Sequence, residues 1–201
     1  MPEVLTAAPA REEINLLPVV KYNGPVQVVN DESGIQQAIQ VLQADKLLGF
    51  DIECRPSFVK GQSHPPALLQ LAAADLVYLF PLRNPEVLDA LAPVLADVGT
   101  IKAGVAVADD LKKLQDLKAF TAESFVDLGS MAARAGLQAA GIRTLAAQLM
   151  GWRISKGERC SNWERTRLTS RQIIYAATDA WISREIYLRL AELLQQKKVE
   201  V

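Results

Sequence analysis

The sequence predicts an α/β fold in which a mixed sheet carries helices on both faces, and three observations lead to this prediction. The apolar run at 47–54 is typical of a buried strand. Two further apolar runs, 67–74 and 76–80, are separated only by Asp75, which is the spacing of an antiparallel hairpin. Beyond them strand-like and helix-like segments alternate, as they do where helices join parallel strands. A three-strand antiparallel meander followed by parallel strands gives a mixed sheet.

Local signals place the remaining elements. Short apolar runs predict three more strands, at 26–29, 100–105 and 124–127. Apolar residues that recur every three or four positions predict helices at 31–44, from Pro85, from about 108 and over most of the chain beyond 129. Thr169 and Gln172 have the spacing of a capping box, so the long final helix is expected to begin there.

A chain of 201 residues suits one domain of ordinary size, which we expect to span 25–201. Residues 1–24 are predicted to form an irregular N-terminal arm because turn formers interrupt them: Pro2, Pro9, Pro18 and Gly24. The 22 basic and 23 acidic side chains nearly balance, which excludes a histone-like polycation. Neither a signal-peptide pattern nor an apolar run of about 18 residues is present. The expected location is therefore cytoplasmic or nucleoid-associated, without a membrane partner.

Two acidic residues, Asp51 and Glu53, interrupt the apolar strand at 47–54. Side chains two positions apart on a strand point to the same face, about 6.6 Å apart along the backbone. Burying one unpaired carboxylate costs several kcal/mol, and two neighbouring carboxylates also repel each other. The pair therefore requires a compensating charge.

Two more acids lie on core-facing stripes of predicted helices. On the last helix, Asp179 shares the apolar face with Tyr175, which lies one turn earlier. On the helix that follows 100–105, Asp110 lies close to the apolar face, whereas Asp109 points almost to the opposite side. Taken alone, Asp179 is explained as well by a structural role, in which a buried arginine or backbone amides satisfy the carboxylate, as by a functional one.

The inward-facing acids come from three separate elements: Asp51, Glu53, Asp110 and Asp179. Such a cluster is stable only if cations occupy it, and a set of carboxylate oxygens suits two divalent cations, Mg²⁺ or Mn²⁺. Two such ions about 3.5–4 Å apart support phosphodiester chemistry. A further acid, Asp127, ends a predicted strand and is expected to cap the next helix instead.

Three motifs resemble those of the DEDD superfamily of 3′–5′ exonucleases, whose fold is related to that of ribonuclease H. "FDIE" at 50–53 resembles the first motif, "GVAVADD" at 104–110 the second, and "YAATD" at 175–179 the third. The tyrosine four residues before the last acid is similar to the tyrosine branch of the superfamily. The resemblance extends over roughly 26–193, and "SNW" and "YAATDAW" are more similar to the Werner-type exonuclease domain than to ribonuclease D.

The resemblance implies a reaction and a role for each motif residue. It implies hydrolysis of the terminal phosphodiester bond of a nucleic acid with a free 3′ end, DNA being favoured over RNA, with release of nucleoside 5′-monophosphates. Asp51, Glu53 and Asp179 would hold a first metal, and Asp51 would bridge to a second. Asp110 would hold the second metal through water, and Tyr175 would orient the attacking water.

A basic segment at 153–171 contains six cationic side chains and only two acids. We expect a nucleic-acid-binding rim there, formed by Lys156, Arg159, Trp163, Arg165 and Arg167, with Trp163 as a stacking platform for a base. The alternative is a solvated basic loop whose tryptophan packs into the core.

Two other functions share this predicted fold. A catalytically silent nucleic-acid-binding or scaffold module would be expected to have lost acids, whereas all four are present together with Tyr175. A ribonuclease H-like endonuclease would use the same sheet and the same metal chemistry. The spacing between the tyrosine and the last acid argues against the endonuclease.

Overall fold

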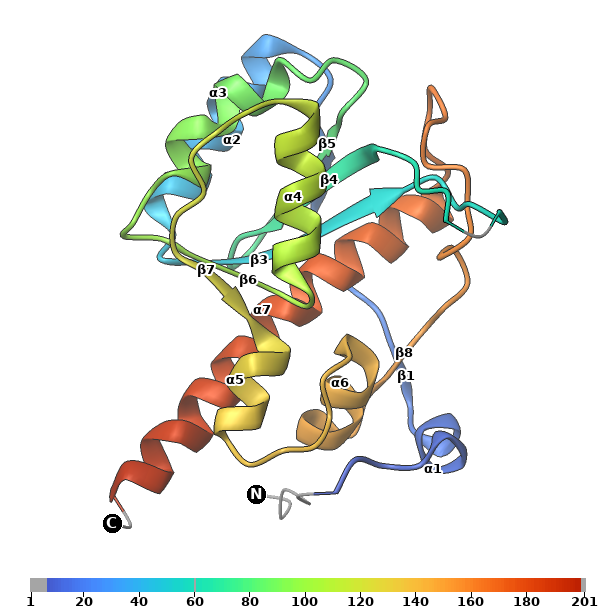
Figure 1. Ribbon diagram of the computed structural model, residues 1–201, viewed down its shortest axis with the longest axis vertical. Helices are drawn as coiled ribbons and strands as arrows, with labels where there is room; N and C mark the ends of the chain where they lie inside the picture. The colour runs from blue at the N-terminus through green and yellow to red at the C-terminus, as the bar shows by residue number, and fades with distance from the viewer. Residues whose placement is uncertain (1–6, 60, 200–201) are drawn as a thin grey trace.

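A six-stranded mixed sheet forms the centre of the protein (Figure 1), whose computed structural model describes residues 7–59 and 61–199. The strands lie in the order β2 (Val26–Val28), β5 (Val77–Pro81), β4 (Pro66–Ala72), β3 (Leu47–Cys54), β6 (Ile101–Gly104) and β7 (Phe125–Asp127). β3, β4 and β5 form an antiparallel meander. β2 joins β5 in parallel, and β6 and β7 continue in parallel from β3. The predicted mixed sheet is therefore confirmed.

Helices cover both faces of this sheet, as predicted. One face packs against α2 (Glu32–Ala44), α3 (Val87–Leu95) and α4 (Val107–Leu117), and the other against α5 (Leu128–Arg134), α6 (Ile142–Met150) and α7 (Ser170–Val199). Along β3 the side chains of Leu48, Phe50 and Ile52 point into the first of these two cores. The residues between them therefore point toward α7. None of the described helices is both long and apolar enough to cross a membrane.

Helix α7 begins at the predicted capping box. The Gln172 amide donates to the Thr169 hydroxyl at 3.2 Å, and the Thr169 amide donates to the Gln172 side chain at 3.0 Å. These two bonds satisfy backbone donors that the first helical turn leaves without a partner. From this start α7 runs for 30 residues beneath the sheet and past α5 (Figure 1).

The contact between α7 and β3 is close because β3 has a glycine at the crossing. A Cβ on Gly49 would overlap the carbonyl group of Ala180 in α7. Backbone rather than a flexible side chain occupies that space, so no rotamer change could make room for a larger residue. Gly49 therefore fixes how closely the helix that carries Asp179 approaches the strand that carries Asp51.

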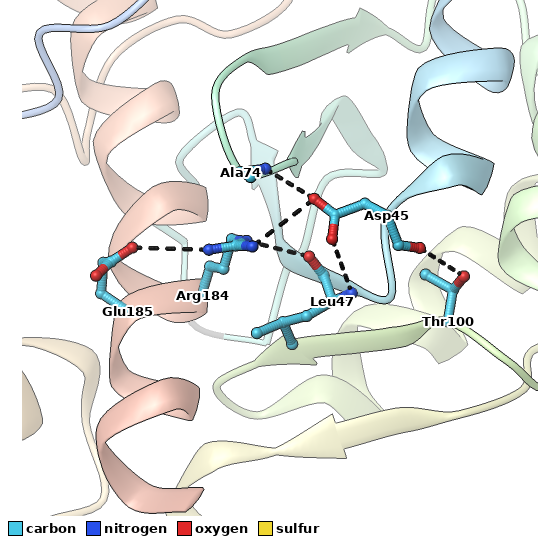
Figure 2. Close-up of polar contacts among 6 residues, drawn as sticks. All are labelled: Asp45, Leu47, Ala74, Thr100, Arg184 and Glu185. Atoms are coloured by element: carbon cyan, nitrogen blue, oxygen red, sulfur yellow. Dashed lines mark hydrogen bonds and ion pairs between the residues drawn. The ribbon is translucent and has the colours of Figure 1, made fainter. Parts of the chain in front are cut away.

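A polar network holds the same helix at the start of β3 (Figure 2). The Arg184 guanidinium donates to the Leu47 carbonyl at 3.1 Å and lies 3.7 Å from the Asp45 carboxylate. That carboxylate also accepts from the backbone amides of Leu47 at 3.2 Å and Ala74 at 2.8 Å. The Thr100 hydroxyl donates to the Asp45 carbonyl at 3.0 Å. One side chain of α7 is thus connected to β3, to the β4–β5 turn and to the residue before β6.

The N-terminal arm is more regular than predicted. Residues Arg11–Leu16 form the short helix α1, and β1 (Val19–Val20) pairs in parallel with β8 (Arg153–Ile154). The prediction of an irregular segment was wrong over these residues, because β1 is stabilised by a partner more than a hundred positions away. The first six residues of the arm lie outside the described part of the chain.

We predict that Gly49→Ala destabilises the protein strongly, because α7 must move away from β3 to accommodate the new methyl group. Overpacking of this kind costs on the order of 1–3 kcal/mol or more. Urea denaturation, monitored by circular dichroism, measures the change in the free energy of unfolding. Gly157→Ala is the matched control, since its nearest neighbouring atom would be at 3.4 Å, an ordinary contact. Equal stability of the two variants would contradict the close approach at Gly49.

Candidate active site

Three acidic side chains meet where α7 crosses β3. Ligand oxygens of Asp51, Glu53 and Asp179 all lie within 4.8 Å of one another. Asp51 and Glu53 alternate with the apolar side chains of β3 and therefore face α7, and Asp179 precedes the residue that packs on Gly49. The acids predicted from the periodicity of the strand and from the apolar stripe of the helix thus lie together in the structure.

The fourth predicted acid, Asp110, approaches the cluster from α4. The turn from β6 into this helix passes through Ala106, which has a left-handed backbone with φ of 56°. Asp110 is half-buried, whereas Asp109 is exposed, which confirms the predicted helical register. Lys113 lies one turn further on, with its Nζ 3.3 Å from the Asp110 carboxylate. Asp110 does not belong to the group within 4.8 Å, but its charge acts on both Asp51 and Glu53.

The cluster strongly resists ionisation when no cation is bound. Burial raises the pKa of Glu53 to about 10 and the pKa of Asp51 well above its usual range. The charges of the neighbouring acids add to this effect and are its second largest cause. Burial raises the pKa of Asp179 to about 7, although a hydrogen bond from Tyr175 and the charge of Arg143 oppose this shift. Burial also raises the pKa of Asp110, although the ion pair with Lys113 acts to lower it. Three acids so close together therefore release their protons at higher pH than free carboxyl groups do, and bound cations would favour the ionised forms.

Tyr175 lies next to the cluster, one turn before Asp179. Its hydroxyl hydrogen-bonds to the Asp179 carboxylate, and burial followed by the Asp179 charge raises the pKa of the phenol. Arg143, from α6, also interacts with Tyr175 and Asp179. The sequence analysis missed Arg143, because nothing in its local pattern indicates that α6 places it against the last helix.

Gln70 is a second residue that the sequence analysis did not select. It lies opposite Asp51 in the β3–β4 register and is completely buried. Residues opposite each other in an antiparallel pair share a face of the sheet, so Gln70 is on the side of the acids. Neither of its amide atoms has a hydrogen-bond partner within the described structure. An uncompensated buried amide is costly, which makes Gln70 an unusual neighbour for a carboxylate in an otherwise apolar strand.

The structure contradicts the predicted stacking role of Trp163. Its side chain is only 2% exposed and packs against Tyr175, with the ring centroids 5.9 Å apart. A nucleic-acid base cannot stack on a ring that the protein already covers. The alternative interpretation, that the tryptophan packs into the core, is therefore correct. Trp163 contacts the ring of Tyr175 beside the acidic cluster.

The other predicted rim residues are exposed, but they do not all lie at the acids. Arg159 is close enough for its charge to lower the pKa of Glu53 against the larger effect of burial. Lys156 lines a hollow beside the N-terminal arm. Arg165 and Arg167 are exposed side chains in the segment before α7. Asp127 accepts from the Ser130 amide at 2.7 Å and caps α5, as predicted.

Comparison with known proteins agrees with the motifs and the geometry. A family model described as 3′–5′ exonuclease matches residues 26–195. The chain belongs to this 3′–5′ exonuclease family. The match spans every strand of the six-stranded sheet and all four acids of the predicted site.

Curated relatives share the domain but are longer proteins. The chain is 36% identical over 159 residues to "Exonuclease 3′-5′ domain-containing protein 2" of Drosophila melanogaster, covering 77% of this chain and 27% of that protein. It is 31% identical over 188 residues to "Bifunctional 3′-5′ exonuclease/ATP-dependent helicase WRN" of Mus musculus, covering 88% of this chain and 13% of that protein. The chain thus corresponds to a small part of either relative.

Solved structures share the fold. The EXO domain of Nibbler from Aedes aegypti superimposes with a TM-score of 0.78 at 21% identity, over 89% of this chain and 94% of that domain. RNase D from Escherichia coli superimposes with a TM-score of 0.73 at 20% identity, over 85% of this chain and 45% of that enzyme. These similarities confirm the predicted ribonuclease H-like architecture.

We predict that the metal-free protein loses stability as the pH rises. In the folded state Asp179 and Glu53 keep their protons up to about pH 7 and about pH 10, whereas the unfolded chain releases them near pH 4. The unfolded state then binds fewer protons, so the free energy of unfolding falls between these limits. Thermal denaturation in chelator across a pH series measures this slope. Asp51→Asn should reduce it, and a free energy of unfolding that increases with pH would contradict the protonated cluster.

Proposed function

We propose that this chain hydrolyses the terminal phosphodiester bond of a nucleic acid at its 3′ end by a two-metal-ion mechanism and releases nucleoside 5′-monophosphates. The observation that carries the proposal is the group of three carboxylates within 4.8 Å of one another, each with a raised pKa. Membership of the 3′–5′ exonuclease family supports the direction of the reaction.

The acidic cluster fits divalent cations. Its donors are carboxylate oxygens, which Mg²⁺ and Mn²⁺ prefer, and their mutual repulsion disappears when a positive charge lies between them. Asp51, Glu53 and Asp179 would hold a first cation, Asp51 would bridge to a second, and Asp110 would hold that one through water. Bound cations would supply charge stabilisation for the attacking and leaving oxygens.

The remaining side chains of the site have separate tasks in this proposal. The Tyr175 hydroxyl, which interacts with the Asp179 carboxylate, orients the attacking water as donor and acceptor. Trp163 covers one side of the tyrosine ring and limits its motion. Arg143 and Arg159 bring positive charge to the edge of the cluster, where the phosphate of the terminal nucleotide would bind.

We propose DNA as the favoured substrate, with RNA as the alternative. The preference rests on the resemblance of "SNW" and "YAATDAW" to the Werner-type exonuclease domain. The structural neighbours include ribonucleases, among them an RNase D from Trypanosoma brucei in complex with RNA, at 19% identity. Matched DNA and RNA strands are therefore both needed in any assay of activity.

We predict that a 5′-labelled strand is shortened stepwise. A 3′-labelled strand should release its label as a mononucleotide. The reaction should require Mg²⁺ or Mn²⁺ and stop in chelator. Asp51→Asn should lose nearly all activity while remaining folded, because the substitution removes one repelling charge. Gel analysis of single-stranded and duplex DNA and RNA measures the products. Internal fragments would indicate an endonuclease, and intact strands under every metal condition would indicate a silent binding module.

A second pair of variants tests which acid on α4 takes part. Asp110→Asn should lower turnover by orders of magnitude, because the half-buried carboxylate would no longer assist the second cation. Asp109→Asn is the matched control, since its side chain is exposed and Asp109 is not among the residues whose charges act on Asp51 or Glu53. Initial rates at saturating Mg²⁺ decide the result. Equal losses in both variants would exclude a specific role for Asp110.

A further inference from the structure

A basic hollow lies between the N-terminal arm and the segment that contains β8. Its volume is about 640 Å³, and cationic side chains from separate parts of the chain line it: Arg11, Arg143, Arg153 and Lys156. Among the described residues of its wall, none is acidic. A protein with a nearly balanced overall charge thus gathers four positive charges around one opening.

These cations are positioned by the backbone rather than neutralised by acids. Arg143 donates to the Ser155 carbonyl, and Arg153 donates to the Asn15 carbonyl at 2.6 Å. A guanidinium has five N–H donors, so each arginine keeps donors for a ligand. Within the described part of the chain, no carboxylate lies within 4.0 Å of any of the four. Arg143 also acts on the Asp179 charge at longer range, so Arg11, Arg153 and Lys156 are the cations whose charge is most available to an anion.

Arg11 has no evident role in the folding of its own helix. It is exposed and is the first residue of α1, where a cation opposes the helix dipole. The arm nevertheless holds it at the hollow. The arm is fastened by the β1–β8 pair, by a bond from Gln148 to the Ala7 carbonyl at 3.1 Å, and by a bond from the Tyr22 amide to the Thr178 hydroxyl at 3.0 Å.

The basic hollow adjoins a second hollow that reaches two residues of the candidate active site. This second hollow, of about 340 Å³, is lined by Tyr175 and Asp179. The two hollows share Val19, Ile154 and Ser155 in their walls. The shared wall residues, at β1 and at the end of β8, place the basic hollow next to the one that reaches Asp179, on the side where a strand whose end lies at the acids would extend.

We propose that this basic hollow, built jointly by the N-terminal arm and the β8 segment, binds backbone phosphates of the substrate strand upstream of its 3′ end. The proposal rests on the proposed exonuclease function, because that function places the 3′ end at the acids. A phosphodiester backbone matches the site chemically, since it presents regularly spaced negative charges to a group of cations that form no close ion pair with a carboxylate. The arm thus forms part of the substrate-binding surface.

The test compares two double variants of the full chain that each remove two positive charges. Arg11→Gln with Lys156→Gln alters the hollow, and Lys46→Gln with Arg134→Gln is the matched control on exposed positions outside its wall. Fluorescence anisotropy in chelator measures the affinity for single-stranded DNA and RNA of increasing length across a salt series. Hydrolysis of a dinucleotide in Mg²⁺ is measured in parallel, because its single phosphodiester group cannot occupy both hollows.

The hollow variant should bind long strands more weakly. Its plot of log affinity against log salt should be less steep by about 1.4, which is twice the contribution of one phosphate contact on a single strand. Dinucleotide hydrolysis should remain at the level of the unsubstituted protein. Affinity and salt slope equal to those of the control variant would overturn the proposal. Failure of the exonuclease function itself would look different, since the unsubstituted protein would then hydrolyse neither dinucleotide nor strand.

Discussion

The close packing of α7 on β3 is the contact on which the rest of the site depends. Gly49 allows the helix backbone to approach the strand, and the Arg184 network holds the helix at that distance. Because Asp51 follows Gly49 by two positions and Asp179 precedes Ala180 by one, the same contact brings their carboxylates together. A small change in the position of α7 would therefore alter the spacing of the acids before it disrupted the fold.

The same contact creates an electrostatic cost that the fold has to compensate. Acids that are buried this close to one another ionise only with difficulty, so the metal-free cluster holds protons and weakens the protein at neutral pH. Extensive apolar packing on both faces of the sheet offsets this cost. Functional sites commonly retain such local conflicts, because the strain is relieved when the ligand binds. In this protein the relieving ligand would be a pair of divalent cations.

Charge is distributed unevenly around the site, and this matters more than the overall charge of the chain. Carboxylates gather at the crossing of α7 and β3, while cations gather at the hollow beside the N-terminal arm. Cations at the acids and phosphates at the hollow would neutralise the two regions in turn. Trp163 belongs to neither region, since it is buried against Tyr175 and stabilises the position of that ring.

The sequence by itself determined the features that depend on local periodicity. It located the strand that carries Asp51 and Glu53, the inward register of Asp110, the capping box of α7 and the cap at Asp127, because each follows from repeats of two or 3.6 residues or from a short-range hydrogen bond. Only the tertiary structure decided the β1–β8 pair, the burial of Trp163 and the approach of Arg143 to Tyr175. Each of these joins segments far apart in the chain, and a local pattern carries no information about which distant segment will cover or contact a side chain.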